Sequence, residues 1–236
     1  MKLGLNQQST IKNQQFFTVP CYLPNMIRAS TFAGVILAAG DSSRMGRDKA
    51  LLPWPPPVAG QAISNDTFLS AAIRSLLLTT DFVVVVVGKN EAALAPIIYA
   101  DGASLVVNKD PSRGQFSSLQ IGLREVLNHG RDAAMVTLVD RPPVSPATLQ
   151  NLHDAFDAAD PNIWAVVPEF SGKHGHPYLV DRGMIEAFLR VPPTSIARDV
   201  EHQNQEHIQY VPVDDPLVAL NVNTPEDYAA LLMRCS

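Results

Sequence analysis

The sequence contains little cysteine. Of its 236 residues, Cys21 and Cys235 are the two cysteines, and they lie near opposite ends of the chain with no CxxC pair. Thiols this few and this far apart predict neither a disulfide framework nor a zinc site. Because the pattern suits a reducing compartment, we expect a cytoplasmic protein.

Long apolar runs are also lacking. The longest candidate, FVVVVVG over residues 82–88, has the length of a strand, whereas a membrane-spanning helix needs ~18 apolar residues. The first 30 residues are polar, rich in Gln and Asn, and without the apolar core of a secretory signal. We therefore expect no membrane association, and we interpret residues 1–30 as a flexible leader before a single domain at 31–236.

A basic excess is missing as well, since 23 acidic and 18 basic residues give a net charge of −5. General nucleic-acid binders carry a basic surface, so we do not expect a nucleic-acid partner. Two common nucleotide-binding fingerprints, GxGxxG and GxxxxGK[ST], do not occur. The missing GxGxxG disfavours a Rossmann-like oxidoreductase.

The sequence does contain a regular alternation of short β-rich runs with helical periodicity. This alternation predicts an α/β fold with a mostly parallel sheet. The expected strands are 33–38, 82–87, 103–108, 133–139, 163–168, 177–180 and 207–213. The expected helices begin near Asp66 or Thr67, near Phe116, after Ser145 as N-cap and after Thr224 as N-cap, the last two with proline at the first helical position.

Polar clusters follow several of the expected strands. They are residues 40–49, 108–118 and 140–142, the KHGHP loop at 173–177, and the NVN loop at 221–223. Ligands of open parallel sheets bind where the strands end at their carboxyl termini. The sequence therefore predicts one site built from these clusters.

The first cluster lies in VILAAGDSSRMGRDKALLP, residues 35–53. Its small residues 38–40 let backbone N–H groups approach a ligand closely, and a serine of the loop is placed to cap a short helix facing an anion. Arg44 and Lys49 supply a forked donor and a point charge, which together match a polyphosphate. The alternative is a basic surface turn, and we expect Lys49 to be exposed.

Two further candidates have structural alternatives. Asp140 ends a strand, where an aspartate suits a turn but also supplies the oxygen ligand that Mg²⁺ prefers. His174 and His176 flank Gly175, and no third metal ligand lies nearby in the sequence, so we reject a zinc site. Two roles stay open for these histidines: contact with the acceptor, or a structural part in a turn.

The stretch LAAGDSSRMGRDKALLP resembles the signature loop of the MobA-like NTP transferases, and within that group the chain is most similar to the molybdenum cofactor cytidylyltransferases. The resemblance extends from about residue 33 to 233. Four later motifs support it: Asn108 and Gly114 before SSLQIGL (117–123), an Asp-x-Pro at 140–142, a Gly-His-Pro at 175–177, and NVNTPEDY at 221–228.

The resemblance implies a single Rossmann-like, three-layer α/β/α domain of the nucleotide-diphospho-sugar transferase type. It also implies a Mg²⁺-dependent nucleotidyltransferase that moves an NMP from an NTP, CTP being favoured, to a phosphate of a small acceptor such as molybdopterin, with release of pyrophosphate. A molybdoenzyme or a chaperone is the further partner that this activity implies.

The family's site residues carry over to this chain by position. The implied nucleotide-binding residues are Leu37, Ala38, Ala39, Gly40, Ser43, Arg44, Lys49, Gly114, Ser117 and Ser118. Arg44, Lys49 and Asp140 are implied as catalytic residues. Asp140 and Asn223 are implied as Mg²⁺ ligands, and His176 is implied as an acceptor contact.

The chain departs from the family where many relatives have aspartate and it has Asn221 and Asn223. An amide oxygen ligates Mg²⁺ without contributing negative charge. The Pro-rich stretch 54–65 also looks longer than usual. Two alternatives therefore stay open: a nucleotide-binding protein that has lost transfer, and a transferase for another acceptor, such as a sugar phosphate or phospholactate.

Overall fold

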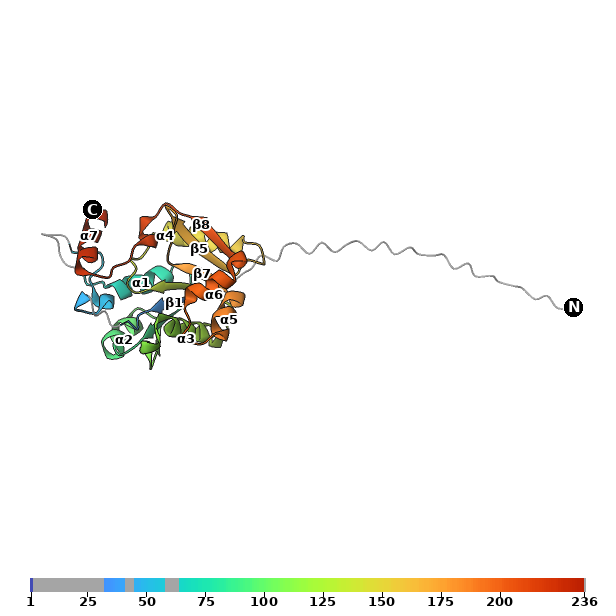
Figure 1. The fold of residues 1–236 in the computed structure, drawn as a ribbon, viewed down its shortest axis with the longest axis horizontal. Coiled ribbons are helices and arrows are strands. Elements are labelled where there is room, and N and C mark those ends of the chain that lie inside the picture. The colour runs from blue at the N-terminus through green and yellow to red at the C-terminus, as the bar shows by residue number, and fades with distance from the viewer. Residues whose placement is uncertain (2–31, 41–44, 58–63, 236) are drawn as a thin grey trace.

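The computed structural model describes Met1 and residues 32–40, 45–57 and 64–235, which form a sheet with helices on both faces (Figure 1). The predicted leader, together with Ser43 and Arg44 of the first loop, lies outside the described residues.

The sheet has eight strands within the described ranges. They are β1 (Phe32–Leu37), β2 (Phe82–Val87), β3 (Ser104–Val107), β4 (Ala133–Leu138), β5 (Ala165–Phe170), β6 (Lys173–His174), β7 (Tyr178–Asp181) and β8 (Ile208–Pro212). The order is β3-β2-β1-β4-β7-β5-β6, and β8 pairs with β5. β1 to β4 pair in parallel, as do β5 and β8, whereas β7 runs antiparallel to β4 and β5. The predicted mostly parallel α/β fold is confirmed.

The described part of the chain contains seven α-helices. They are α1 (Phe68–Leu76), α2 (Glu91–Ala100), α3 (Gln115–Asn128), α4 (Pro146–Asp157), α5 (Arg182–Arg190), α6 (Ala197–Gln203) and α7 (Pro225–Cys235). Side chains of α1, α2 and α4 share one buried cluster with the sheet, and those of α3, α5 and α6 share a second. This division gives the three predicted layers.

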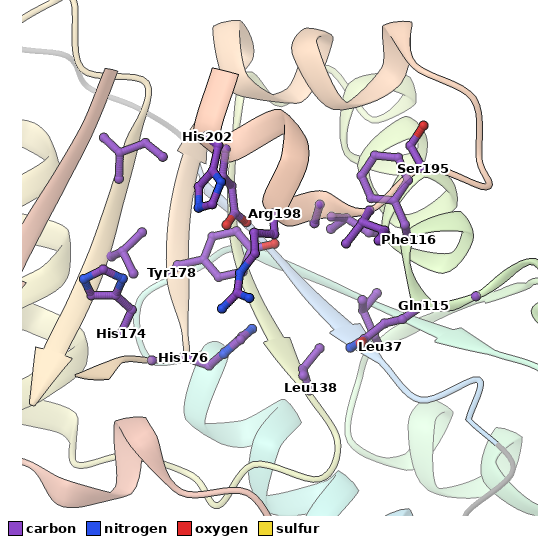
Figure 2. Close-up of a pocket in the computed structure, with 18 of the residues that line it drawn as sticks. Leu37, Gln115, Phe116, Leu138, His174, His176, Tyr178, Ser195, Arg198 and His202 are labelled. Atoms are coloured by element: carbon purple, nitrogen blue, oxygen red, sulfur yellow. The ribbon is translucent and has the colours of Figure 1, made fainter. Parts of the chain in front are cut away.

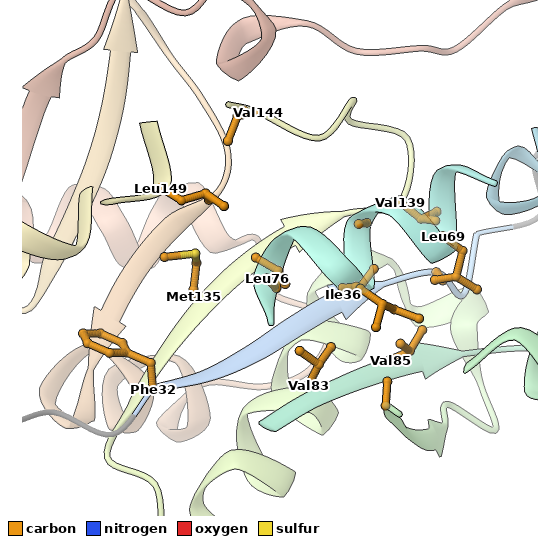
Figure 3. Close-up of a cluster of buried hydrophobic side chains, with 14 of the residues drawn as sticks. Phe32, Ile36, Leu69, Leu76, Val83, Val85, Met135, Val139, Val144 and Leu149 are labelled. Atoms are coloured by element: carbon orange, nitrogen blue, oxygen red, sulfur yellow. The ribbon is translucent and has the colours of Figure 1, made fainter. Parts of the chain in front are cut away.

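The central strands are apolar on both sides because helices cover both faces of the sheet. All six residues of β1 are buried. Figure 3 shows the first cluster, in which Ile36, Val85 and Met135 from three adjacent strands lie with Leu69 and Leu76 of α1. Full burial of one such side chain contributes about 1.5–3 kcal/mol to folding.

The expected N-caps Ser145 and Thr224 are confirmed, as is the expected helix start near Thr67. The side chains of Thr67 and Ser145 accept hydrogen bonds from backbone N–H groups at the starts of α1 and α4. At α7, the N–H of Asp227 donates to the Thr224 hydroxyl at 3.2 Å, and the Thr224 N–H donates back to the Asp227 carboxylate at 3.0 Å. Each cap satisfies backbone donors that the helix leaves unpaired.

Several elements were not expected from the sequence. α2 contains Pro96, which argues against a helix locally, and β6 is two residues long. α5 and α6 lie between expected strands and were not assigned. No helix among the described residues is long and apolar enough to cross a membrane.

Candidate functional site

The predicted clusters meet at one edge of the sheet. The parallel strands β1 to β4 end there, and β7 begins there because it is antiparallel to β4. The N–H of Val222 donates to the carbonyl of Asp140 at 2.9 Å, which attaches the NVN loop to the end of β4. The N–H of His176 donates to the carbonyl of Val218 at 2.9 Å, so the KHGHP loop is held beside the segment leading to NVN.

Lys49 lies at the centre of this edge. Its Nζ is 3.1 Å from Oδ2 of Asp140 and donates to Oδ1 of Asn223 at 2.8 Å. The lysine begins a short 3₁₀ helix, η2 (Lys49–Leu51), whose N-cap Asp48 accepts from the N–H of Ala50 at 3.0 Å. The expectation that Lys49 is exposed is wrong: it is 8% exposed. Its contacts with residues far along the chain account for the burial.

The oxygen atoms around Lys49 fit a hard divalent cation. Oδ1 of Asp140 and Oδ1 of Asn221 are buried and have no hydrogen-bond partner among the described residues. Carboxylate and amide oxygens are the donors that Mg²⁺ and Mn²⁺ prefer. Within the described ranges no three His, Cys, Asp or Glu side chains gather as a metal-binding group. A metal ion here would be coordinated by one carboxylate. Amide, water or substrate oxygens would complete its coordination shell.

A cavity of about 210 Å³ lies against Lys49 and Asp140. The predicted residues that line this smaller cavity are Leu37, Ala39, Gly40, Lys49, Gly114, Ser118 and Asp140. A Cβ at Gly40 would have no atom within 4 Å. Gly114 is the N-cap of α3, with φ +97°, and no side chain caps this helix end. The positive end of a 14-residue helix therefore borders the cavity, which favours an anion.

Ser117 lies outside this cavity. It is 1% exposed, its Oγ donates to the carbonyl of Gly114 at 2.7 Å, and it accepts from Nδ2 of Asn108 at 2.9 Å. The same amide donates to Oγ of Ser118 at 2.9 Å. These bonds use the Ser117 hydroxyl at the start of α3, where Gly114 is the N-cap. The expected nucleotide contact of Ser117 stays a prediction.

A larger cavity, of about 880 Å³, adjoins the smaller one and shares Leu37, Gly114, Gln115 and Leu138 with it. Its wall comes from the start of α3, the KHGHP loop, β7, β8 and α6. In Figure 2 the side chains of His176, Tyr178 and Arg198 point into the same space, with Leu37 and Leu138 to their right. The two cavities are continuous with each other, so ligands bound in them can come into contact.

His176, predicted as an acceptor contact, lines the larger cavity. Burial, and to a lesser degree the nearby Arg141 cation, lowers the pKa of His176 to about 3, so its imidazole is neutral at pH 7. Its Nδ1 is buried and has no partner among the described residues. The preceding Gly175 is required by space, because a Cβ there would lie 2.2 Å from the carbonyl oxygen of Val218.

Sequence reasoning missed several residues that line the larger cavity. Arg198, Glu201 and His202 lie on α6. Their i, i+3, i+4 spacing was an available signal for one helical face. Arg141 also lines the cavity and donates from Nη1 to the carbonyl of Leu220 at 2.9 Å. Burial lowers the pKa of Arg141, but an arginine stays charged at pH 7.

Asn90 was also missed, and it connects the loops after β1 and β2. Its Nδ2 donates to the carbonyl of Ala38 at 2.9 Å and to Oδ2 of Asp48 at 2.7 Å, and its Oδ1 accepts from the N–H of Gly88 at 3.0 Å. Because Asp48 caps the 3₁₀ helix that carries Lys49, Asn90 positions both the first loop and the lysine.

We expect Asn90→Asp to destabilise the fold by about 1–3 kcal/mol, because a carboxylate would face the Asp48 carboxylate and leave the Ala38 carbonyl without its donor. Urea unfolding measures the change. Adding Asp48→Asn restores a donor between the two side chains and should recover part of the loss. Wild-type stability of the single Asn90→Asp variant would contradict this role.

The fold and the site together define a class: an α/β protein whose sheet edge carries a lysine and oxygen donors suited to a divalent cation and an anionic nucleotide. The chain matches the MobA-like NTP transferase domain over residues 34–209. It therefore belongs to the MobA-like NTP transferase family, which confirms the predicted family, the predicted fold class and the prediction of a nucleotidyltransferase.

The chain is also similar to individual proteins and solved structures over most of its length. The chain is 29% identical to the nicotine blue oxidoreductase of Paenarthrobacter nicotinovorans, over 84% of this chain and 95% of that protein. It is 24% identical to the molybdenum cofactor cytidylyltransferase of Escherichia coli, over 82% and 92% respectively. The crystal structure of Rv0371c from Mycobacterium tuberculosis matches with a TM-score of 0.71 and 29% identity, over 87% of this chain and 98% of that one. A structure of Rv0371c in complex with manganese also matches, with a TM-score of 0.68, 28% identity, and coverage of 87% and 99%.

Proposed function

We propose that this protein transfers a nucleoside monophosphate from an NTP, with CTP as the preferred donor, to a phosphate of molybdopterin. The observation that carries the proposal is the meeting of two cavities at Leu37 and Leu138, with Lys49 and Asp140 on the smaller one. The smaller cavity receives the phosphates of the nucleotide, and the larger one receives the acceptor. This assignment agrees with the names of relatives that act on the molybdenum cofactor.

In the proposed reaction a phosphate oxygen of the acceptor attacks the α-phosphorus of the NTP. A new phosphorus–oxygen bond forms, the bond from the α-phosphorus to the bridging oxygen of the β-phosphate breaks, and pyrophosphate leaves with the electron pair of that bond. Such chemistry depends on positioning and charge neutralisation more than on a covalent nucleophile.

The residues of the smaller cavity have distinct roles in this proposal. Lys49 neutralises charge on the leaving pyrophosphate, and the N-terminal end of α3 binds phosphate oxygens beside Gly114. Residues 37–40 contact the nucleotide, and Ser43 and Arg44 of the same loop are proposed to bind its phosphates. Leu37, Ala39 and Gly40 line the cavity, whereas Ala38 is buried and held by Asn90.

Asp140 and Asn223 are the proposed ligands of a divalent cation, Mg²⁺ or Mn²⁺, and Asn221 is a neighbour with an available oxygen. When bound, the cation would supply positive charge to the phosphate oxygens of the nucleotide. Lys49 contacts both proposed ligands, so we expect it to move toward the triphosphate when the cation binds. On the acceptor side, His176 lines the larger cavity as a neutral contact.

The donor preference is tested by thermal unfolding with CTP, GTP, ATP or UTP, each with Mg²⁺ or Mn²⁺. A ligand that binds the folded state raises the melting temperature, by about 5–10 °C at a concentration of about 100 times its Kd. We expect the largest shift with CTP. An equal shift with all four nucleotides would contradict the base preference.

Transfer is tested by pyrophosphate release in the presence of CTP, metal and molybdopterin. We expect release that requires the acceptor. Sugar phosphates and phospholactate in place of molybdopterin test the alternative acceptors. Nucleotide binding without pyrophosphate release from any of them would favour a protein that has lost transfer.

A further inference from the structure

The larger cavity is lined by several cationic and aromatic side chains and by one carboxylate. Among its described lining residues, Arg113, Arg141 and Arg198 carry positive charge, and Glu201 is the one acidic residue. A carboxylate in this wall would repel a ligand that carried only negative charge. Its presence indicates that the ligand also carries hydrogen-bond donors.

The carboxylate of Glu201 makes no hydrogen bond or ion pair with any residue that the structure describes, in contrast to the carboxylate of Glu186, which pairs with Arg182 and Arg190. Glu201 lines the larger cavity together with His174, Arg198 and His202. Burial raises the pKa of Glu201, while the charges of His202, Arg198 and His174 act in the opposite direction. A partly buried carboxylate without a donor is unfavourable, so a ligand that donates to it gains binding energy.

The surroundings of Glu201 favour a flat ring. His174 stacks on Tyr210 with ring centroids 3.9 Å apart, and His176 meets Tyr178 with centroids 5.2 Å apart. All four line the larger cavity with Glu201. Aromatic walls contact the faces of a planar heterocycle, and a carboxylate at the wall contacts its edge.

The donor pattern that best matches a carboxylate is a pair of parallel N–H groups, since both oxygens then accept. A 2-amino-4-oxo heterocycle in its lactam form has such a pair, formed by the ring N3–H and the neighbouring 2-amino group. A dioxo heterocycle presents one N–H between two carbonyl groups, and the outer carbonyls repel a carboxylate.

We propose that Glu201 binds the N3–H and 2-amino edge of a 2-amino-4-oxo heterocycle in the larger cavity, while Arg198 binds an anionic group of the same ligand. The inference rests on the proposed function for the identity of the acceptor, because the pterin of molybdopterin has this edge. It makes Glu201 the residue that selects the acceptor ring.

The test uses two fluorescent probes, pterin-6-carboxylate and lumazine-6-carboxylate, titrated against the full-length protein. Both carry the same anionic group, and they differ at position 2, where pterin has an amino group and lumazine an oxo group. We expect the wild type to bind the pterin at least about tenfold more tightly. Glu201→Gln should abolish this preference, chiefly by weakening the pterin.

The matched control is Glu206→Gln, which removes the same charge from an exposed residue outside the cavity wall. It should keep the wild-type preference. Glu201→Asp keeps the charge but withdraws it by one methylene, and it should retain a reduced preference. Circular dichroism confirms that each variant is folded, and Glu201→Asp decides the question if the glutamine variant is not.

Any of three results would overturn the inference: the wild type binds neither probe, it binds both equally, or the preference survives in Glu201→Gln. The transfer assay separates this result from the proposed function. Pyrophosphate release with an unchanged acceptor KM in Glu201→Gln would leave the function standing and remove the role of Glu201. A Glu201-dependent pterin preference without transfer would support the role of Glu201 and contradict the function.

Discussion

Asp140→Asn is expected to lower turnover by about 10³-fold, because it removes the one carboxylate from the proposed metal ligands. The substitution keeps the size of the side chain and leaves the backbone carbonyl that accepts from Val222. Turnover is measured by pyrophosphate release, and binding of Mn²⁺ is measured separately by electron paramagnetic resonance. We expect the variant to lose both.

The matched control for this experiment is Asp214→Asn, at an exposed residue far along the chain from Asp140. It changes the net charge equally and should leave turnover and Mn²⁺ binding at wild-type values. If Asp140→Asn bound Mn²⁺ as tightly as the wild type and kept its metal-dependent turnover, Asp140 would not be the ligand.

Lys49→Met is expected to lower turnover by about 10²–10³-fold, because the cation proposed to stabilise the leaving pyrophosphate is lost. Burial of Lys49 adds a second effect. Without its ammonium group, Asp140 and Asn223 lose the donor that they share. We expect a fall of about 1–3 kcal/mol in the free energy of unfolding, measured with urea.

Two controls separate the effects on catalysis and on stability. Arg124→Met removes a positive charge from an exposed position of α3 outside both cavities and should change neither quantity. Lys49→Arg keeps the charge and should lose less turnover than Lys49→Met. Near wild-type turnover in Lys49→Met would refute the catalytic role, whatever its stability.

Strands and helix starts were predictable where the signal is local. FVVVVV forms β2 over the expected residues, and Ser145 and Thr224 cap their helices, because cap chemistry and strand hydrophobicity act within a few residues. Elements without a strong local signal were not predicted. β6 is too short for a pattern, and the proline in α2 resembles a breaker even though the helix continues through it.

The candidate site was likewise predictable only in part. The residue types pointed to phosphate and metal chemistry, and the family's motifs pointed to Lys49 and Asp140. The exposure of Lys49 was misjudged, since burial depends on contacts between residues 91 and 174 positions apart in the chain. The hydrogen bonds of Ser117 with Asn108 and Gly114 were also not predictable, because nothing local shows that these two residues use its hydroxyl.

Local pattern and motif were thus enough to establish an α/β transferase fold and the chemical character of its first loop, because both depend on neighbouring residues along the chain. Only the tertiary structure shows that Lys49 lies between Asp140 and Asn223. It also places a neutral His176 in one cavity with Glu201, whose carboxylate has no partner among the described residues. The physical reason is that burial sets the charge state of a side chain, and contacts with residues far along the chain set its position. Both arise where β1, β4, α6 and the NVN loop are brought to one edge of the sheet.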